Sequence, residues 1–215
     1  MSRILLLDFR GLIASLAIGI IILFFSGKFW LQNFILLLTF LILSVAVTKW
    51  KHEEKKEKGL YEHERGWKNV LSNGGIPALC CIAYYFNPSP AWISAYICSL
   101  AAAAADKFGS ELGVLSGKPI NLRNFKLTKP GTSGAISGLG TLMSFNGALI
   151  ISLISYILFL FDPLNIFLIA IIGFFGGVVD TLMGIPEELG FGTKSTTNVI
   201  CTIVGLVLGY IFIVL

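Results

Sequence analysis

The sequence predicts an all-α, polytopic membrane protein with about seven transmembrane helices and a cytoplasmic N-terminus. Of its 215 residues, 55% are hydrophobic and only 13% are charged, and the mean hydropathy is +0.83. A soluble domain of this size cannot bury so much apolar surface in one core. The apolar residues are also gathered into segments that approach the roughly 20 residues of a spanning helix. The whole chain, residues 1–215, is therefore expected to form a single transmembrane domain.

Seven apolar segments follow one another along the chain, and the third and fourth are short. They cover residues 11–26, 30–48, 70–87, 91–105, 132–161, 164–184 and 196–215. The first follows Arg3 and Arg10 as a signal peptide would, but no small-residue cleavage site comes after it, so we expect a retained helix. No Arg- and Ser-rich transit segment is recognised, which favours a prokaryotic plasma membrane.

Charged residues are concentrated in three connecting loops, at 49–69, 106–130 and 185–195. With seven helices and a cytoplasmic N-terminus these loops share one face, and Lys28 alone of the sixteen basic residues lies on the other. This distribution follows the positive-inside rule. The net charge of +4 reflects that topology, and because acids are interleaved with the basic residues we expect no nucleic-acid partner. Any chemistry is expected at the cytoplasmic face, since the outer turns are short.

Histidines and cysteines give no sign of a transition-metal site. His52 and His63 lie in the mixed-charge segment 49–68, which we expect to be a solvated surface segment capable of forming a helix. The cysteines all lie in apolar segments without ligand spacing, and they are expected to be small buried hydrophobic residues. They are Cys80, Cys81, Cys98 and Cys201.

A short acidic pattern occurs twice, once after the fourth apolar segment and once at the end of the sixth. In both places an aspartate is followed by a glycine and then by Glu-Leu-Gly. The two copies are Asp106, Gly109 and Glu111–Gly113, and Asp180, Gly184 and Glu188–Gly190. This predicts a duplication of helix pairs in which two acidic corners face each other. The alternative is coincidence in a short pattern.

Asp106, Glu111 and Asp180 are the candidate catalytic residues and Mg²⁺ ligands. Phosphoryl transfer needs a divalent cation, and Mg²⁺ binds one or two carboxylates together with substrate phosphates. On an ideal helix Asp106 and Glu111 point about 140° apart, so they can share one ion only if the helix breaks near Gly109. The alternative is that both acids merely begin a cytoplasmic loop. Asp180 follows Gly176 inside an apolar segment, where an acid is costly unless it has a function.

Polar residues at the expected cytoplasmic ends of the helices are candidate ligands for phosphate or nucleotide. Gly131–Gly134 is expected to open the fifth helix, whose N-terminus could hold a phosphate; ordinary N-capping is the alternative. Asn146, deeper in that helix, is expected either to link helices or to contact substrate. The candidates for phosphate or nucleotide are Arg65, Asn69, Asn73, Lys129, Gly131, Thr132, Ser133, Gly134, Lys194 and Asn198.

Four motifs in a fixed order resemble the integral-membrane family that contains plant phytyl-phosphate kinase and animal transmembrane protein nineteen. They span residues 65–75, 101–116, 130–134 and 173–184. Lys107, Phe108 and Gly109 depart from the Thr, Trp and Ala that are typical of the family. The resemblance implies transfer of a phosphoryl group from a nucleoside triphosphate to an isoprenyl monophosphate, giving the diphosphate.

The leading hypothesis is therefore a Mg²⁺-dependent isoprenyl-phosphate kinase whose lipid tail lies between helices. A phosphate monoester is largely ionised near neutral pH, so its attack needs no catalytic base. A prenol kinase or lipid cytidylyltransferase on the same scaffold is the nearest alternative, and an alcohol acceptor would require Asp106 or Asp180 as base. A small transporter is a further alternative, although the outer face lacks the polar residues of an alternating path. A purely structural membrane protein is the last alternative.

Overall fold

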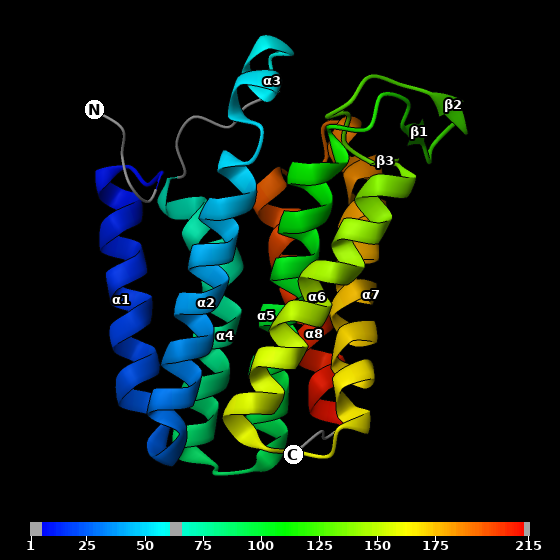
Figure 1. Cartoon of the computed structure of the whole chain (residues 1–215). Helices are drawn as coiled ribbons and strands as arrows, with labels where there is room; N and C mark the ends of the chain where they lie inside the picture. Colours follow the sequence, from blue (N-terminus) through cyan, green and yellow to red (C-terminus); the bar gives the residue numbers. More distant parts are fainter. Residues whose placement is uncertain (1–5, 61–65, 213–215) are drawn as a thin grey trace.

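The chain forms a bundle of long helices that run side by side, with a small polar cap at one end (Figure 1). The computed structural model describes residues 6–60 and 66–212. In these residues the long helices are α1 (Phe9–Phe25), α2 (Trp30–Lys49), α4 (Trp67–Phe86), α5 (Pro90–Gly113), α6 (Gly138–Phe159), α7 (Leu164–Glu188) and α8 (Lys194–Ile211). A 3-10 turn at Gly27–Phe29 precedes α2, and the short helix α3 (His52–Glu57) belongs to the cap.

Each predicted apolar segment corresponds to one of these long helices. Four segments are long and apolar enough to cross a membrane, judged by length and composition: Gly27–Lys49, Gly138–Phe159, Leu164–Glu188 and Lys194–Ile211. Helix α1 is apolar but shorter. Helices α4 and α5 carry polar residues such as Asn73 and Asp106, which are buried inside the bundle and lower the mean hydropathy of these helices. The helical, membrane-type fold is thus confirmed.

Helix α5 is the centre of the bundle, and most of its residues are buried. It packs against α2, α4, α6, α7 and α8. Its alanines at 101–105 face glycines of α7: a Cβ atom on Gly173 would lie 2.7 Å from Ala101 Cβ, and one on Gly176 would lie 2.6 Å from Ala102 Cβ. Small residues on both sides let the two backbones approach closely. This contact places the end of α7 directly beside the end of α5.

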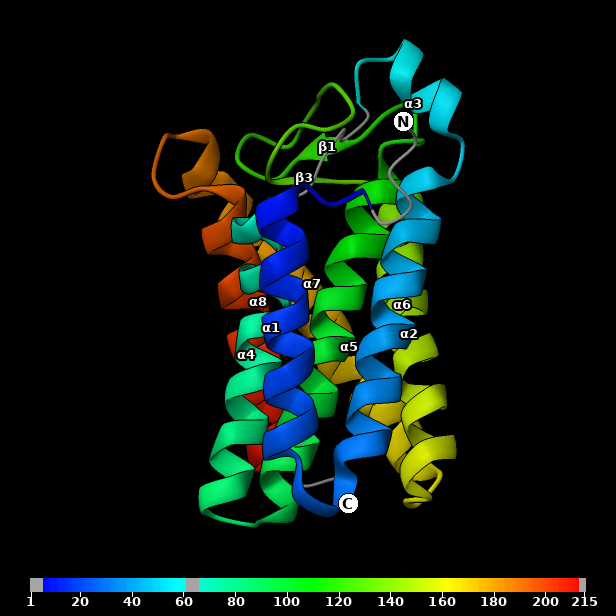
Figure 2. The ribbon, with the colours of Figure 1, turned by 90° about the vertical axis from the view of Figure 1, so that its left-hand side faces the viewer.

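The charged connecting segments all lie at the same end of the bundle (Figures 1 and 2). Helix α3, the strands and the turn between α7 and α8 form this cap, whereas the short turns lie at the opposite end. All four cysteines are buried in the bundle, which confirms their interpretation as small core residues.

A three-stranded antiparallel sheet, absent from the sequence prediction, occupies the segment between α5 and α6. Its strands are β1 (Ile120–Asn121), β2 (Lys126–Leu127) and β3 (Ala135–Ile136), in the order β2-β1-β3. Ile120 pairs with Leu127 and with Ile136. Two hydrogen bonds attach this sheet region to the end of α7: Asn121 Nδ2 donates to Glu188 Oε2 (3.0 Å), and Ser133 Oγ donates to Glu187 Oε2 (3.0 Å).

Two connecting loops are shorter than predicted, because the helices before them continue further. The loop expected at 106–130 begins later, because α5 continues to Gly113, and the loop expected at 185–195 is shortened because α7 continues to Glu188. Lysine partners lie beside Asp106 and Glu111, so these acids can remain in a helix inside the protein. The acidic motif therefore lies on a helix and not in a loop.

Candidate functional site

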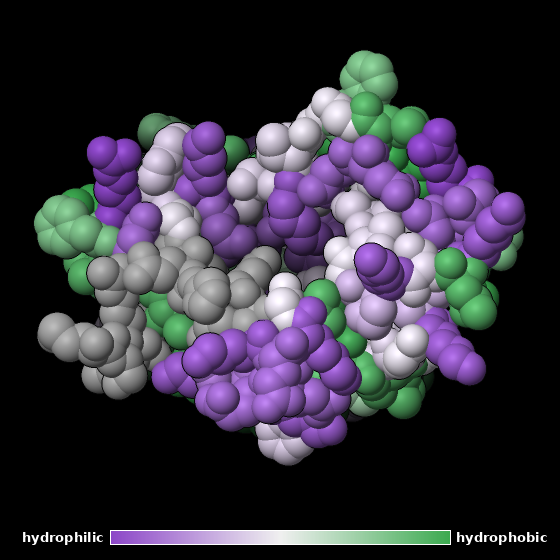
Figure 3. Space-filling view, turned by 90° about the horizontal axis from the view of Figure 1, so that it is seen from above, coloured by the Kyte–Doolittle hydropathy of each residue, from purple (hydrophilic) through white to green (hydrophobic). Residues whose placement is uncertain are grey.

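A cavity of about 570 Å³ lies at the capped end of the bundle. Its walls come from α5, α6, α7 and the first turns of α4 and α8, together with the segment 130–137. Figure 3 looks onto this end and shows hydrophilic residues gathered around a central hollow. Ten predicted site residues line the cavity: Asn69, Asp106, Glu111, Gly131, Thr132, Ser133, Gly134, Asp180, Lys194 and Asn198.

The other four predicted site residues are placed differently. Arg65 lies outside the described residues. Asn73 is buried in α4 next to the cavity and donates from Nδ2 to the carbonyl of Asn69 (2.8 Å). Lys129 is exposed, and Asn146 donates to the carbonyl of Leu142 within α6 (2.8 Å). These last two residues therefore do not join the cavity wall.

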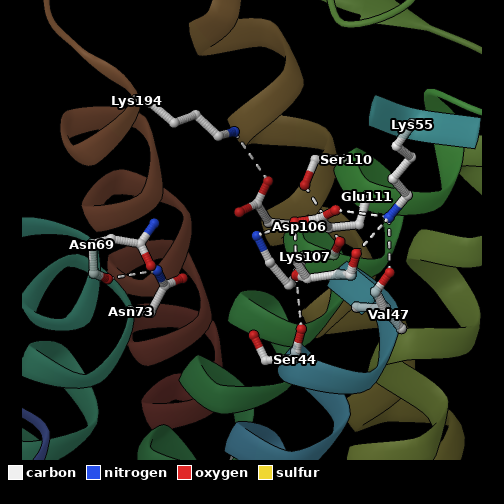
Figure 4. A network of polar contacts seen from close by, with 11 residues as sticks. Ser44, Val47, Lys55, Asn69, Asn73, Asp106, Lys107, Ser110, Glu111 and Lys194 are labelled. Carbon is white, nitrogen blue, oxygen red and sulfur yellow. Dashed lines mark hydrogen bonds and ion pairs between the residues drawn. The ribbon is translucent and has the colours of Figure 1, made fainter. Parts of the chain in front are cut away.

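Asp106 and Asp180 converge on a single lysine, and we call them the aspartate pair. Lys194 Nζ lies 3.3 Å from Asp106 Oδ1 (Figure 4). It also lies 2.9 Å from Asp180 Oδ2. Both carboxylates are buried, and Asp180 Oδ1 has no hydrogen-bond partner in the described part of the chain. A buried carboxylate oxygen without a partner is costly and needs an explanation. One carboxylate oxygen of the aspartate pair is thus buried without a hydrogen-bond partner in the described residues.

Close helix packing explains why the two aspartates meet. Gly177 lies one turn before Asp180, and a Cβ atom there would lie 2.7 Å from Ser144 Oγ and 3.4 Å from the backbone nitrogen of Asp106. A side chain at Gly177 would therefore require Ser144 and Ala105 to shift. The N-cap Thr193, which accepts a hydrogen bond from the Thr196 amide, starts α8 so that Lys194 projects toward both acids.

Glu111 belongs to a separate cluster on another side of α5 (Figure 4). Its Oε2 lies 2.9 Å from Lys55 Nζ, and its Oε1 accepts from Thr48 Oγ1 (2.8 Å) and lies 2.6 Å from Lys107 Nζ. Helix α5 is continuous through Gly109, so the break that would let Glu111 and Asp106 share one ion does not occur. We call Glu111 and these three partners the Glu111 cluster.

Lys55 is the main residue that the sequence interpretation missed. Its side chain is fully buried although it lies in the segment that was expected to be solvated, so this expectation is wrong at Lys55. Lys51 has a φ of 49°, and the turn there folds α3 back over the end of α2. Lys55 Nζ donates to the carbonyls of Val47 (2.9 Å) and Thr48 (3.2 Å), where the α2 dipole favours a cation. Nothing in a run of alternating lysines and glutamates distinguishes this lysine beforehand.

Replacing Lys55 is expected to destabilise the fold. Lys55→Met keeps an unbranched side chain but leaves Glu111 with one fewer cation in a buried site, which should lower the free energy of unfolding by about 3 kcal/mol. Unfolding by SDS in mixed micelles measures this change. The exposed neighbour Lys56 provides the control, since Lys56→Met should leave the free energy nearly unchanged. Equal, small effects for both variants would contradict the structural role of Lys55.

The segment Gly131–Gly134 does not open a helix, so that prediction is wrong. Gly131 and Gly134 have φ values of 84° and 70°, which a right-handed helix does not permit. Helix α6 begins at Gly138, and its N-cap is Ser137, whose Oγ accepts from the Gly140 amide at 3.0 Å. The segment is a loop that nevertheless lines the cavity.

Several further residues of the cavity wall were not among the predicted site residues. Lys107 was considered only because it replaces a threonine that is typical of the family, and Glu187 was not considered as a site residue. On α6, Ser137, Thr141 and Ser144 line the wall at a spacing of three to four residues. This spacing is visible in the sequence, but small polar residues at that spacing equally indicate helix packing.

Among the described residues, no group of three His, Cys, Asp or Glu side chains forms a ready-made metal site. Mg²⁺, however, is usually bound through one or two carboxylates together with substrate phosphates and water. The aspartate pair and its unpartnered Asp180 Oδ1 fit that mode of binding.

Comparison with known proteins identifies relatives along most of the chain. A family described as integral membrane protein DUF92 matches residues 2–205. An uncharacterized membrane protein of Methanocaldococcus jannaschii is 42% identical over 206 residues, which cover 94% of this chain and 84% of that protein. An uncharacterized membrane protein of Synechocystis is 31% identical over 132 residues, 58% of this chain and 51% of that protein.

A plant relative extends the comparison. Protein VTE6, chloroplastic, of Arabidopsis thaliana is 22% identical over 192 residues, which cover 85% of this chain and 58% of that protein. The chain thus spans little more than half the length of the cyanobacterial and plant relatives. No solved structure matches the chain significantly.

Proposed function

Because the chain belongs to the DUF92 family of integral membrane proteins, we propose that it is a membrane kinase. The reaction transfers a phosphoryl group from a nucleoside triphosphate to an isoprenyl monophosphate of the phytyl or geranylgeranyl type, giving the diphosphate. The sequence resemblance to the family of plant phytyl-phosphate kinase supports this choice of reaction. The observation that carries the proposal is the aspartate pair, buried in the wall of a polar cavity at one end of an apolar helix bundle.

In this proposal Asp106 and Asp180 hold Mg²⁺ together with the triphosphate. Bound Mg²⁺ supplies neutralisation of the charge on the phosphate oxygens. Glu111, which the sequence grouped with these two acids, instead fixes Lys107 in the cavity wall through an ion pair of 2.6 Å. The chain's own contribution is therefore positioning and charge: carboxylates for the cation, and ammonium groups for the phosphates.

The acceptor needs no catalytic base, because a phosphate monoester is largely ionised near neutral pH. The residues around it therefore have to bind and orient its phosphate. Thr132 and Ser133 supply hydroxyl groups in the loop above the cavity, and Lys194 and Lys107 supply positive charge in its wall. Phe174 and Val178 of α7 line the same cavity and offer an apolar surface for the first isoprene unit.

We place the capped end of the bundle in the cytoplasm, where nucleoside triphosphates are available. The clustering of basic residues in the loops of this end supports that orientation by the positive-inside rule. All seven long helices then cross a prokaryotic plasma membrane. They include α1, which is short, and α4 and α5, whose polar side chains lie inside the bundle.

A substrate panel tests the proposed reaction. Purified protein in detergent is incubated with Mg²⁺, each labelled nucleoside triphosphate, and either isoprenols or isoprenyl monophosphates. The proposal predicts isoprenyl diphosphate from the monophosphate acceptor and no product from the alcohol. A monophosphate formed from the alcohol would indicate a prenol kinase, and a cytidylated lipid would indicate a cytidylyltransferase. Failure to consume any triphosphate would leave a transporter or structural protein as the better interpretation.

A further inference from the structure

Lys194 occupies the space between the two carboxylates of the aspartate pair. Its Nζ lies within 3.3 Å of Asp106 and 2.9 Å of Asp180, and so it bridges two acids that come from different helices. A cation that bridges Asp106 Oδ1 and Asp180 Oδ2 has to take the position that Nζ occupies. An ammonium group and a divalent cation at this place therefore compete for one site.

Lys194 is much less enclosed than the acids that it contacts. Its side chain is 43% exposed, whereas those of Asp106 and Asp180 are 5% and 8% exposed. Lys194 is the first residue of α8 and lines the cavity. A change of its side-chain rotamer can therefore move Nζ without moving a helix. The acids are fixed and the lysine is the movable partner.

The lysine also satisfies the aspartate pair incompletely. Asp180 Oδ1 has no partner among the described residues while Oδ2 binds Lys194. A divalent cation carries one more positive charge than the ammonium that it replaces. This difference in charge is the driving force for exchange once a metal ion carries phosphate ligands into the cavity.

We infer that Lys194 is an exchangeable counter-ion of the aspartate pair. Lys194 neutralises Asp106 and Asp180 when no metal is bound, and its ammonium turns to the phosphate in the cavity when a divalent cation takes its place. The identity of that phosphate rests on the proposed function, whereas the competition between lysine and metal does not. The consequence is that free metal binds weakly, and that metal and phosphate ligand bind together.

Mn²⁺ serves as the probe, because the loss of its free electron paramagnetic resonance signal measures binding without any turnover. Lys194→Met removes the competing ammonium, and it should tighten the binding of Mn²⁺ in the absence of nucleotide by at least about tenfold. Lys194→Arg keeps a cation and should bind Mn²⁺ as weakly as the unmodified protein. Lys126→Met changes an exposed lysine of β2 outside the cavity and should have no effect.

Thermal unfolding gives a second measurement should Lys194→Met be poorly stable. Two buried carboxylates without their lysine should lower the unfolding temperature, and Mn²⁺ should restore it in Lys194→Met but not in Lys194→Met combined with Asp180→Asn. Unchanged affinity together with no stabilisation by Mn²⁺ would overturn the inference. Tighter Mn²⁺ binding in a protein that consumes no triphosphate would instead support the inference and refute the kinase.

Discussion

The Asp106→Asn and Asp180→Asn variants are each expected to lower kcat/KM for phosphoryl transfer by about a hundredfold or more while the protein stays folded. The amide keeps the volume of the side chain but removes the charge that holds the metal ion and its phosphates. Both carboxylates line one cavity and contact one lysine, so neither can replace the other. Steady-state kinetics at saturating isoprenyl monophosphate and varied Mg²⁺ measures the loss.

Combining the two substitutions should cost little more than either alone, because residues that act as one unit are not additive. Glu53→Gln provides the control: Glu53 is an exposed acid of α3, and its loss of charge should leave the rate nearly unchanged. A folded Asp180→Asn protein with close to normal turnover at limiting Mg²⁺ would remove Asp180 from the site.

Gly184→Ala is expected to reduce activity by roughly tenfold or more through a displaced loop. A Cβ atom at Gly184 would lie 2.3 Å from the backbone nitrogen and 2.9 Å from the Cα of Gly134, so the backbone of one segment has to move. The segment that moves more easily is the loop 130–134, which lines the cavity, because α7 is held along its length by α5, α6 and α8. Kinetics combined with circular dichroism separates this effect from unfolding.

Gly138→Ala is the matched control, since a Cβ atom at the first residue of α6 would meet nothing within 4 Å. It should leave both helicity and rate nearly unchanged. Similar rates for Gly184→Ala and the unmodified protein would mean that the loop does not help to hold the substrate.

The helices could be predicted from the sequence because apolar length is a strong signal, and each of the seven segments became a helix. An acidic pattern that occurs twice in the sequence predicted that Asp106 and Asp180 face each other, and in the structure both contact Lys194. Ion pairs formed through tertiary structure were not predictable. Lys55 lies 56 residues from Glu111, and no local pattern connects them.

The cap was poorly predicted for a different reason. Each of its strands has two residues, too few to show the alternation that identifies a strand. The start of α6 was misplaced because Thr132 and Ser133 look like capping residues, whereas the positive φ angles of Gly131 and Gly134 become visible only in the folded chain. Glycines in a sequence indicate where such angles are permitted, not where they occur.

The fate of a labelled phosphate tests the proposed kinase most directly. Purified protein is supplied with Mg²⁺, an isoprenyl monophosphate, and the nucleoside triphosphate labelled either at the γ or at the α phosphate. We expect γ label to appear in the lipid diphosphate and α label to stay out of it, and we expect Asp180→Asn to slow the transfer by about a hundredfold or more. Label entering the lipid from the α position, or γ-label transfer at a near-normal rate in Asp180→Asn, would contradict the proposed kinase.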